Sequence, residues 1–102
     1  MTIVGSNLYV TDFGNHTIRK IVLSTGAVTT VAGSGSGGSA NGTGTSASFN
    51  LPGYITSDGT NLYVADTNNH MIRKIVISTG AVTNLAGSAG SSGSTDGTGT
   101  AA

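Results

Sequence analysis

The chain has 102 residues, of which 17 are Gly, 36% are hydrophobic and 8% are charged, and its formal net charge is zero. A neutral chain has no basic field for phosphate backbones, which argues against nucleic-acid binding, and no apolar run approaches the ~20 residues of a membrane helix. With no Cys, disulfides and thiol zinc sites are excluded, and either redox compartment is compatible. The stability of so small a chain is marginal unless a disulfide, a metal or contact with other chains adds to it. Other copies of this chain could supply that stabilisation.

A close internal repeat dominates the sequence. Residues 61–87 repeat residues 7–33 at a spacing of 54 (61 − 7 and 87 − 33), and the copies differ at seven of 27 positions: 65, 67, 68, 71, 77, 84 and 85. Such a repeat has to be interpreted before any local motif, because it decides the architecture.

The first copy is predicted to consist of strands and turns. Apolar and β-branched runs predict strands over 7–10, 17–23 and 27–32. Asp, Asn, Gly and Ser in 12–15 and 24–26 predict the intervening turns, which leaves no room for a helix.

A Gly/Ser/Thr-rich segment over 33–48 follows. Its second half, Asn41 to Thr45, recurs as Asp96 to Thr100 at a spacing of 55. This recurrence predicts an ordered surface loop, whereas the GSGSGG half reads as a mobile linker.

The second copy contains a complete unit. Pro52 lies just ahead of its first strand, a tolerated position. Strands are predicted over 54–57, 62–66, 71–78 and 81–86, as a four-stranded antiparallel meander.

The pattern N-L-Y-V-A-D-T-x-N-H-x-I-R-K-I followed by S-T-G-A-V-T-x-L-A-G resembles the NHL repeat, the blade of NHL-type β-propellers. The segment from Phe49 to Gly53 matches the approach to the innermost strand, with Gly53 one position early. The resemblance implies an all-β fold with two propeller blades: a first, N-terminally truncated blade over 1–47 and a second blade over 48–102. It also implies structural or inter-blade roles for Tyr9, Ile18, Phe49, Tyr63 and Ile72.

Two blades cannot close a ring, because both faces of a blade must pack on neighbours and propellers have ~4 to 8 blades. The two exposed faces belong to different blades, so we expect head-to-tail, cyclic contact between copies. Since the family favours six blades, we expect a homotrimer; an eight-bladed homotetramer is the alternative. The resemblance also implies a possible protein or small-molecule ligand at the rim of the channel.

The sequence begins partway into a repeat and ends where the missing segment would follow, as an excised or engineered unit would. We therefore expect Met1 to Val4 to form a shortened inner strand near the Ala102 end of a neighbouring subunit. Domain swapping of a terminal strand is the rival arrangement.

His16 and His70 occupy equivalent positions after Asn. Imidazole is a common metal ligand, so a metal ring at the channel is one interpretation. The sequence lacks the clustered carboxylates or further His that such a site needs, which favours a role in the turn.

Asp12 and Arg19, like Asp66 and Arg73, are seven residues apart on predicted neighbouring strands. This spacing predicts charge-assisted pairs within or between blades. No nucleophile or second acid accompanies either Asp, so we assign no catalytic residue, no metal and no cofactor. The favoured function is a non-enzymatic, self-assembling propeller scaffold or binding module; the alternative is a fragment of a metal-dependent propeller lyase or hydrolase.

Overall fold

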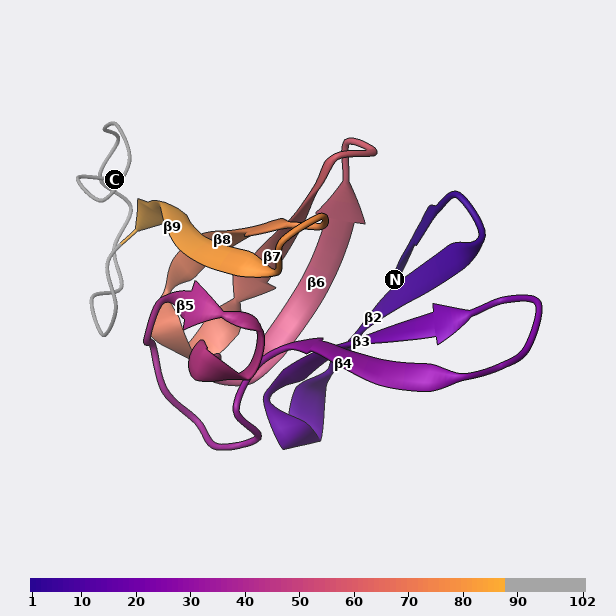
Figure 1. Cartoon of the computed structure of the whole chain (residues 1–102). Coiled ribbons are helices and arrows are strands. Elements are labelled where there is room, and N and C mark those ends of the chain that lie inside the picture. The colour runs from indigo at the N-terminus through magenta and orange to yellow at the C-terminus, as the bar shows by residue number, and fades with distance from the viewer. Residues whose placement is uncertain (88–102) are drawn as a thin grey trace.

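The computed structural model describes residues 1–87, which form two antiparallel sheets joined by one connecting segment (Figure 1). The first sheet has the strand order β1-β2-β3-β4, with β1 (Thr2–Val4), β2 (Asn7–Asp12), β3 (Thr17–Val22) and β4 (Val28–Ala32). The second sheet has the order β5-β9-β8-β7-β6, with β5 (Gly42–Thr43), β6 (Pro52–Ser57), β7 (Asn61–Asp66), β8 (Met71–Val76) and β9 (Ala81–Gly87).

Three short 3₁₀ turns complete the described secondary structure: η1 (Phe13–Asn15), η2 (Gly44–Ser46) and η3 (Thr67–Asn69). None of the helical segments within residues 1–87 has the length and apolar character needed to cross a membrane.

The two sheets have the same strand register and the same turn conformations. Leu8 pairs with Ile21 in the first sheet, and Leu62 pairs with Ile75 in the second, so the repeat is kept in the strand register. The 3₁₀ turns η1 and η3 each end at a histidine in the left-handed region, with φ values of 57° for His16 and 58° for His70. The repeated sequence therefore produces the same local structure twice.

Glycine is required at the equivalent ends of β4 and β9. Gly33 and Gly87 have φ values of 106° and 85°, which L side chains rarely adopt. A Cβ at either position would also collide with the backbone carbonyl oxygen of His16 or His70. The two sheets thus end with the same close approach of two backbone segments.

Most of the predicted strands are present, with ends shifted by one or two residues. The strand predicted from residue 54 begins at Pro52, because a bulge between Pro52 and Tyr54 keeps the strand paired with β7. Proline is tolerated there because β6 lies at the edge of the sheet. Residues 2–4 form β1, which pairs with β2.

The predicted four-stranded meander is present as β6 to β9, but its sheet has a fifth strand that was not predicted. Gly42 and Thr43 form β5, which pairs with Val82 and Ala81 and adds a fifth strand. This strand comes from the Gly-rich connecting segment, whose composition carries no strand signal. The connecting segment therefore belongs structurally with the sheet that follows it.

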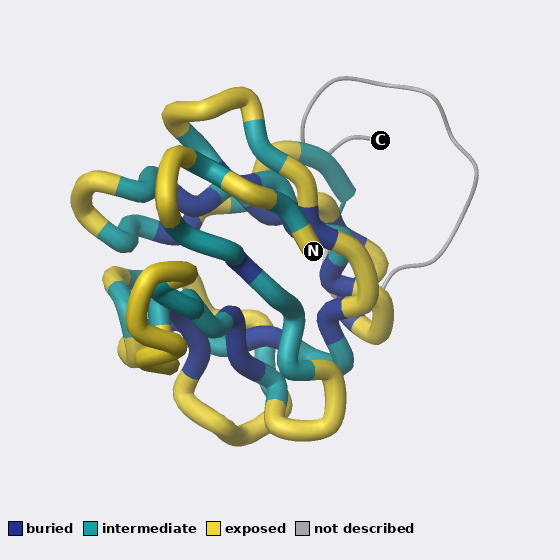
Figure 2. Tube along the Cα trace, turned by 90° about the vertical axis from the view of Figure 1, so that its right-hand side faces the viewer, coloured by how far each residue is buried: buried dark blue, intermediate teal, exposed yellow. Residues whose placement is uncertain are grey.

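One hydrophobic core lies between facing sides of the two sheets (Figure 2). The first sheet contributes Tyr9, Ile18 and Ala32, and the connecting segment contributes Ala47 and Phe49. The second sheet contributes the larger share: Ile55, Leu62, Val64, Ile75 and Val82. Because alternate residues of a strand point to opposite faces, each sheet keeps a second face outside this core.

Candidate functional site

The most informative surfaces are the two sheet faces that point away from the shared core. In the first sheet the outer face carries Ile3, Leu8, Val10, Asp12, Arg19, Ile21 and Val28, and in the second it carries Tyr54, Tyr63, Ala65, Ile72 and Leu85. We call these the first outer face and the second outer face.

Burial of equivalent residues is reversed between the sheets. Ile18 is 0% exposed between the sheets, whereas its counterpart Ile72 is 39% exposed on the second outer face. Val82 is 1% exposed in the core, whereas its counterpart Val28 is 49% exposed on the first outer face. Each outer face is thus the sequence equivalent of a face that is buried at the junction of the two sheets.

The outer faces also keep the composition of a buried face. Six of the seven residues of the first outer face are identical to their equivalents in the second sheet: Leu8/Leu62, Val10/Val64, Asp12/Asp66, Arg19/Arg73, Ile21/Ile75 and Val28/Val82. The exception is Ile3, whose equivalent is Ser57. On the second outer face, Ala65 and Leu85 stand where the buried face has Thr11 and Val31, so this face is more apolar. Exposed apolar patches of this kind mark interaction surfaces.

The second outer face contains a shallow apolar hollow. Tyr54, Thr56, Tyr63, Ala65 and Ile72 line it, and Tyr54 is 81% exposed. In the first sheet the equivalent side of β2 packs on β6, and the Thr11 hydroxyl donates to the Gly53 carbonyl oxygen at 3.3 Å. The hollow is therefore the counterpart of a surface that β6 covers in the first sheet.

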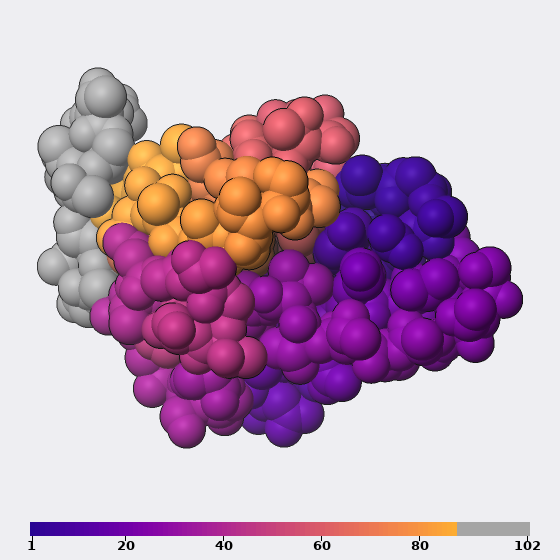
Figure 3. Space-filling view, viewed as in Figure 1, coloured from indigo at the N-terminus to yellow at the C-terminus, as the bar shows by residue number. Residues whose placement is uncertain are grey.

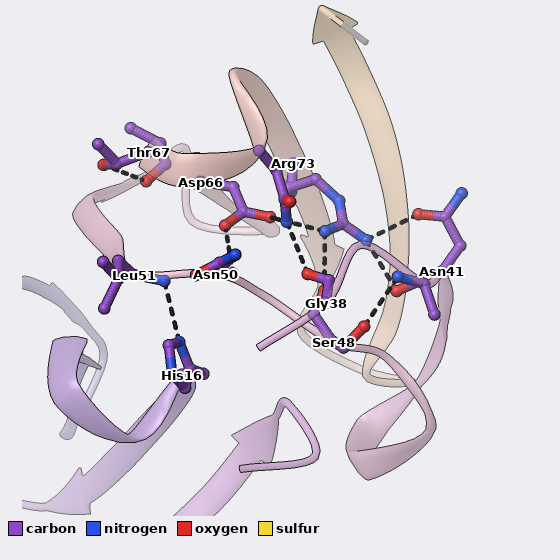
Figure 4. A network of polar contacts seen from close by, with 12 residues as sticks. His16, Gly38, Asn41, Ser48, Asn50, Leu51, Asp66, Thr67 and Arg73 are labelled. Carbon is purple, nitrogen blue, oxygen red and sulfur yellow. Dashed lines mark hydrogen bonds and ion pairs between the residues drawn. The ribbon is translucent and has the colours of Figure 1, made fainter. Parts of the chain in front are cut away.

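Arg73 is the centre of a buried polar network in the second sheet (Figure 4). Its Nη1 donates to Asp66 Oδ2 at 2.8 Å and to the Ser48 carbonyl oxygen at 2.9 Å. Its Nη2 donates to the Ala40 carbonyl oxygen at 2.9 Å and to Asn41 Oδ1 at 2.8 Å. The guanidinium also lies 5.0 Å from the centre of the Phe49 ring, within cation–π range.

The partner carboxylate is equally well satisfied. Asp66 Oδ1 accepts from the Asn50 amide at 2.8 Å, and Oδ2 accepts from Asn69 Nδ2 at 2.8 Å. Both Asp66 and Arg73 side chains are fully buried. Burial of an ion pair is tolerated when further hydrogen bonds support both ions. Here the connecting segment and Asn69 provide them, and within residues 1–87 only Nε of the Arg73 guanidinium has no acceptor.

The equivalent pair in the first sheet is only partly covered. Arg19 Nη1 lies 3.3 Å from Asp12 Oδ2, and the two side chains are 32% and 30% exposed. Asn15 Nδ2 donates to both Asp12 oxygens at 3.1 Å. Among residues 1–87, Asp12 is the only hydrogen-bond acceptor for the Arg19 side chain.

The two histidines also differ in whether the connecting segment contacts them. His16 Nδ1 accepts from the Leu51 amide at 3.0 Å, which ties the first sheet to the connecting segment. His70 is exposed at the equivalent turn. Among the described residues, no group of three His, Asp or Glu side chains is placed to hold a metal ion.

Asp58 closes the turn between β6 and β7. The amides of Asn61 and Thr60 donate to its carboxylate, and the Tyr63 hydroxyl donates to Oδ2 at 2.8 Å. These hydrogen bonds lower the pKa of Asp58 to about 2.

Sequence reasoning found the Asp–Arg pairs but not the residues of the connecting segment that complete one of them. For Asn41 a signal was present, because the repeat places Asp96 at the equivalent position. Ala40 and Ser48 act through backbone carbonyl groups, which carry no sequence signal. Asp96 lies outside the described residues.

The fold and the paired sheets define a class of protein: an all-β, propeller-like architecture. The structure is similar to that of an auxiliary nutrient binding protein from Bacteroides thetaiotaomicron VPI-5482, with a TM-score of 0.66 and 26% identity, covering 80% of this chain and 23% of that one. No protein-family model matches the chain.

Sequence relatives identify the repeat. NHL repeat-containing protein 2 of Bos taurus is 42% identical over 78 residues, which is 74% of this chain and 11% of the relative. The Gallus gallus protein of the same name is 36% identical over 83 residues, 81% of this chain and 11% of the relative. The chain carries NHL repeats, as its motif predicts, and it spans about a tenth of the length of these relatives. Repeat and fold together support a propeller-type binding module.

Proposed function

We propose that the chain is a non-enzymatic, self-assembling propeller scaffold in which the two sheets act as blades and copies join head to tail. The observation that carries this proposal is the reversed burial of equivalent residues: Ile18 and Val82 are buried where Ile72 and Val28 are exposed. The junction between the two sheets of one chain is therefore a template for a junction between two chains.

The two outer faces are complementary to each other rather than to themselves. The first outer face repeats residues on the buried face of the second sheet, and the second outer face repeats the side of the first sheet that packs on β6. A contact between different faces is heterologous and generates a ring when the rotation closes. We infer a homotrimer with six blades, from the ring size common among NHL propellers; a homotetramer with eight blades is the alternative.

Ligand binding by the ring would use its rim or central channel, where loops from several blades meet. We propose a protein or small-molecule ligand there. The competing proposal is a fragment of a metal-dependent propeller lyase or hydrolase. Metal analysis of the purified ring separates the two, because a stoichiometric metal would support the enzyme and contradict the scaffold.

Light scattering after size exclusion tests the assembly with one charged variant on each outer face. We expect three times the chain mass for the unchanged protein and a single-chain mass for Ile72→Asp and for Val28→Asp. Thr25→Asp is the matched control, because it adds the same charge in the β3–β4 turn, where Thr25 Oγ1 already accepts from the Ala27 amide. This control should assemble like the unchanged chain.

Mixing the two variants tests the head-to-tail geometry. Val28→Asp keeps an intact second outer face and Ile72→Asp keeps an intact first outer face, so the mixture should form a dimer of unlike chains. A face that pairs with its own copy would instead let one variant dimerise alone, which contradicts the proposal. A single-chain mass for the unchanged protein at high concentration also contradicts it.

A further inference from the structure

The connecting segment, residues 33–51, contains a reactive dipeptide at Asn41-Gly42. Among the asparagines of the sequence, Asn41 alone is followed by Gly. Gly has no side chain to shield its backbone nitrogen, and it adopts more backbone conformations than any other residue. The amide nitrogen of Gly42 can therefore reach the side-chain carbon of Asn41, whereas a larger residue in its place would hinder this approach.

Arg73 holds the side chain of Asn41. Its Nη2 donates to Asn41 Oδ1 at 2.8 Å (Figure 4). The guanidinium is itself fixed, because the Arg73 side chain is fully buried and its Nη1 donates to Asp66 Oδ2 at 2.8 Å. Asn41 is nevertheless an exposed residue, so water reaches it. The carboxamide is thus restrained by a buried cation while it remains open to solvent.

The backbone of Gly42 is held by β9. Gly42 lies opposite Val82 in the ladder between β5 and β9, and the Gly44 amide donates to the Gly80 carbonyl oxygen at 3.0 Å. Because hydrogen-bonded pairs alternate along an antiparallel ladder, this register places the Gly42 amide against the Val82 carbonyl oxygen. An amide nitrogen in such a pair is not available to attack the Asn41 side chain.

This protection depends on a short contact. β5 has two residues and lies at the edge of its sheet. In the space-filling view the connecting segment (magenta) lies on the outside of the second sheet (orange) (Figure 3). Edge elements with few hydrogen bonds open locally at a lower free energy than the whole fold. When β5 leaves β9, the Gly42 amide and the Asn41 side chain are released together.

We propose that Asn41 is a site of spontaneous deamidation, which Arg73 and β9 protect and which is modified when β5 detaches from β9. The reactive pair, the cation that restrains it and the strand that covers it all lie within residues 1–87. This inference does not depend on the proposed assembly.

The modification uses only water and the chain itself. Hydroxide removes the proton of the Gly42 amide, and the nitrogen attacks Cγ of Asn41. A bond forms between these two atoms, the bond from Cγ to Nδ2 breaks, and Nδ2 takes a proton from water and leaves as ammonia. Water then opens the cyclic imide at either carbonyl carbon, which gives aspartate or isoaspartate. The net change consumes one water, releases one ammonia and involves no oxidation.

The two products act differently on Arg73. Aspartate at position 41 keeps the length of the main chain, and its carboxylate is a stronger acceptor for the guanidinium than an amide. Isoaspartate routes the main chain through the former side chain, which adds a carbon atom to the backbone. The pairing of Gly42 and Thr43 with β9 then loses its register, and Arg73 loses its Asn41 acceptor.

Peptide mass spectrometry of the whole chain, incubated in mildly alkaline buffer, measures the modification at each asparagine. Asn61 and Asn84 are internal controls, because Leu follows each of them. We expect deamidation of Asn41 to be about tenfold faster or more, with aspartate and isoaspartate as products. Equal rates at the three asparagines would overturn the proposal.

The same measurement in urea tests the protection. The rate in the folded chain should be lower than the rate in the unfolded chain. It should also be higher than that rate multiplied by the unfolded fraction, because β5 opens without global unfolding. A folded rate equal to the unfolded rate would show no protection, and one equal to the product would show that β5 does not open by itself. Either result would overturn the proposal.

Two glycine variants test the role of β5. Gly80 and Gly26 have φ values of 76° and 75° at equivalent turns, so alanine adds similar backbone strain at both. Gly80 binds the Gly44 amide next to β5, whereas Gly26 lies in the β3–β4 turn, away from the connecting segment. We expect Gly80→Ala to raise the deamidation rate of Asn41 about threefold or more relative to Gly26→Ala. Equal rates in the two variants would overturn the protection by β5.

Discussion

The first and second sheets have nearly the same sequence and the same register, but they differ in what surrounds them. Asp66 and Arg73 are fully buried beneath the connecting segment, whereas Asp12 and Arg19 are about one-third exposed. The two pairs have the same residues in the same strand register, and the nearby differences at 65, 67, 68 and 71 supply none of the acceptors of Arg73. The difference comes from the neighbour that covers each sheet, as expected for repeats whose stability lies largely in the contacts between units.

The strongest test of this difference is to remove each arginine. Arg73→Met leaves the Asp66 carboxylate buried without its cation, and we expect a loss of about 3–5 kcal/mol in the free energy of unfolding. Arg19→Met removes a partly solvated pair and should cost about 0–1 kcal/mol in dilute protein. Urea denaturation of both variants measures the contrast.

Protein concentration sharpens that comparison. If a neighbouring chain covers Arg19, the cost of Arg19→Met should grow as the chains associate, while the cost of Arg73→Met should stay the same. Equal costs in dilute protein would show that the two sites are covered alike and would contradict the structure.

We expect a smaller difference in stability cost between alanine substitutions of the two histidines. His16→Ala removes the acceptor of the Leu51 amide and should cost about 1 kcal/mol more than His70→Ala. Both substitutions lose a residue type that tolerates positive φ, so this backbone penalty cancels in the comparison. Thermal unfolding in dilute protein is the measurement, and a larger loss for His70→Ala would contradict the assignment.

The smallest effect is expected at the turn between β6 and β7. Because the pKa of Asp58 is lowered from 3.8 to about 2 in the folded chain, its charge stabilises the fold above about pH 4. That contribution is lost as the pH falls through about 2. The first sheet has Val4 at the equivalent position.

We expect the difference in unfolding temperature between the unchanged protein and Asp58→Asn to shrink as the pH falls from 5 to 2, because the Asp58 carboxylate becomes protonated in both the unfolded and the folded chain over this range. A difference that stays constant across this range would mean that the Asp58 charge does not contribute.

The repeat and its strand signals predicted most of the fold. Among the nine strands within residues 1–87, alternating β-branched residues and Gly-containing turns located seven, because each of these carries its own local preference. The position of Met1 to Val4 within the repeat indicated β1. β5 was missed because Gly42 and Thr43 are held as a strand by Val82 and Ala81 rather than by their own propensity.

The candidate site was predictable only in part. A spacing of seven residues predicted that Asp66 and Arg73 could meet across adjacent strands. It could not predict that Arg73 is buried and Arg19 is not, since the two copies are identical at these positions. The acceptors on Ala40 and Ser48 are backbone groups, whose position is set by the path of the connecting segment.

The place of β5 has a consequence for solubility. Part of the outer hydrogen-bonding edge of β9 is occupied by Gly42 and Thr43, but the same edge of β4 has no partner strand within residues 1–87. Val28, Thr29 and Thr30 along it are exposed and uncharged, without a Lys or Pro to deter foreign strands. This stretch is where unwanted cross-β aggregation would begin, so whatever caps it also protects the protein from precipitation.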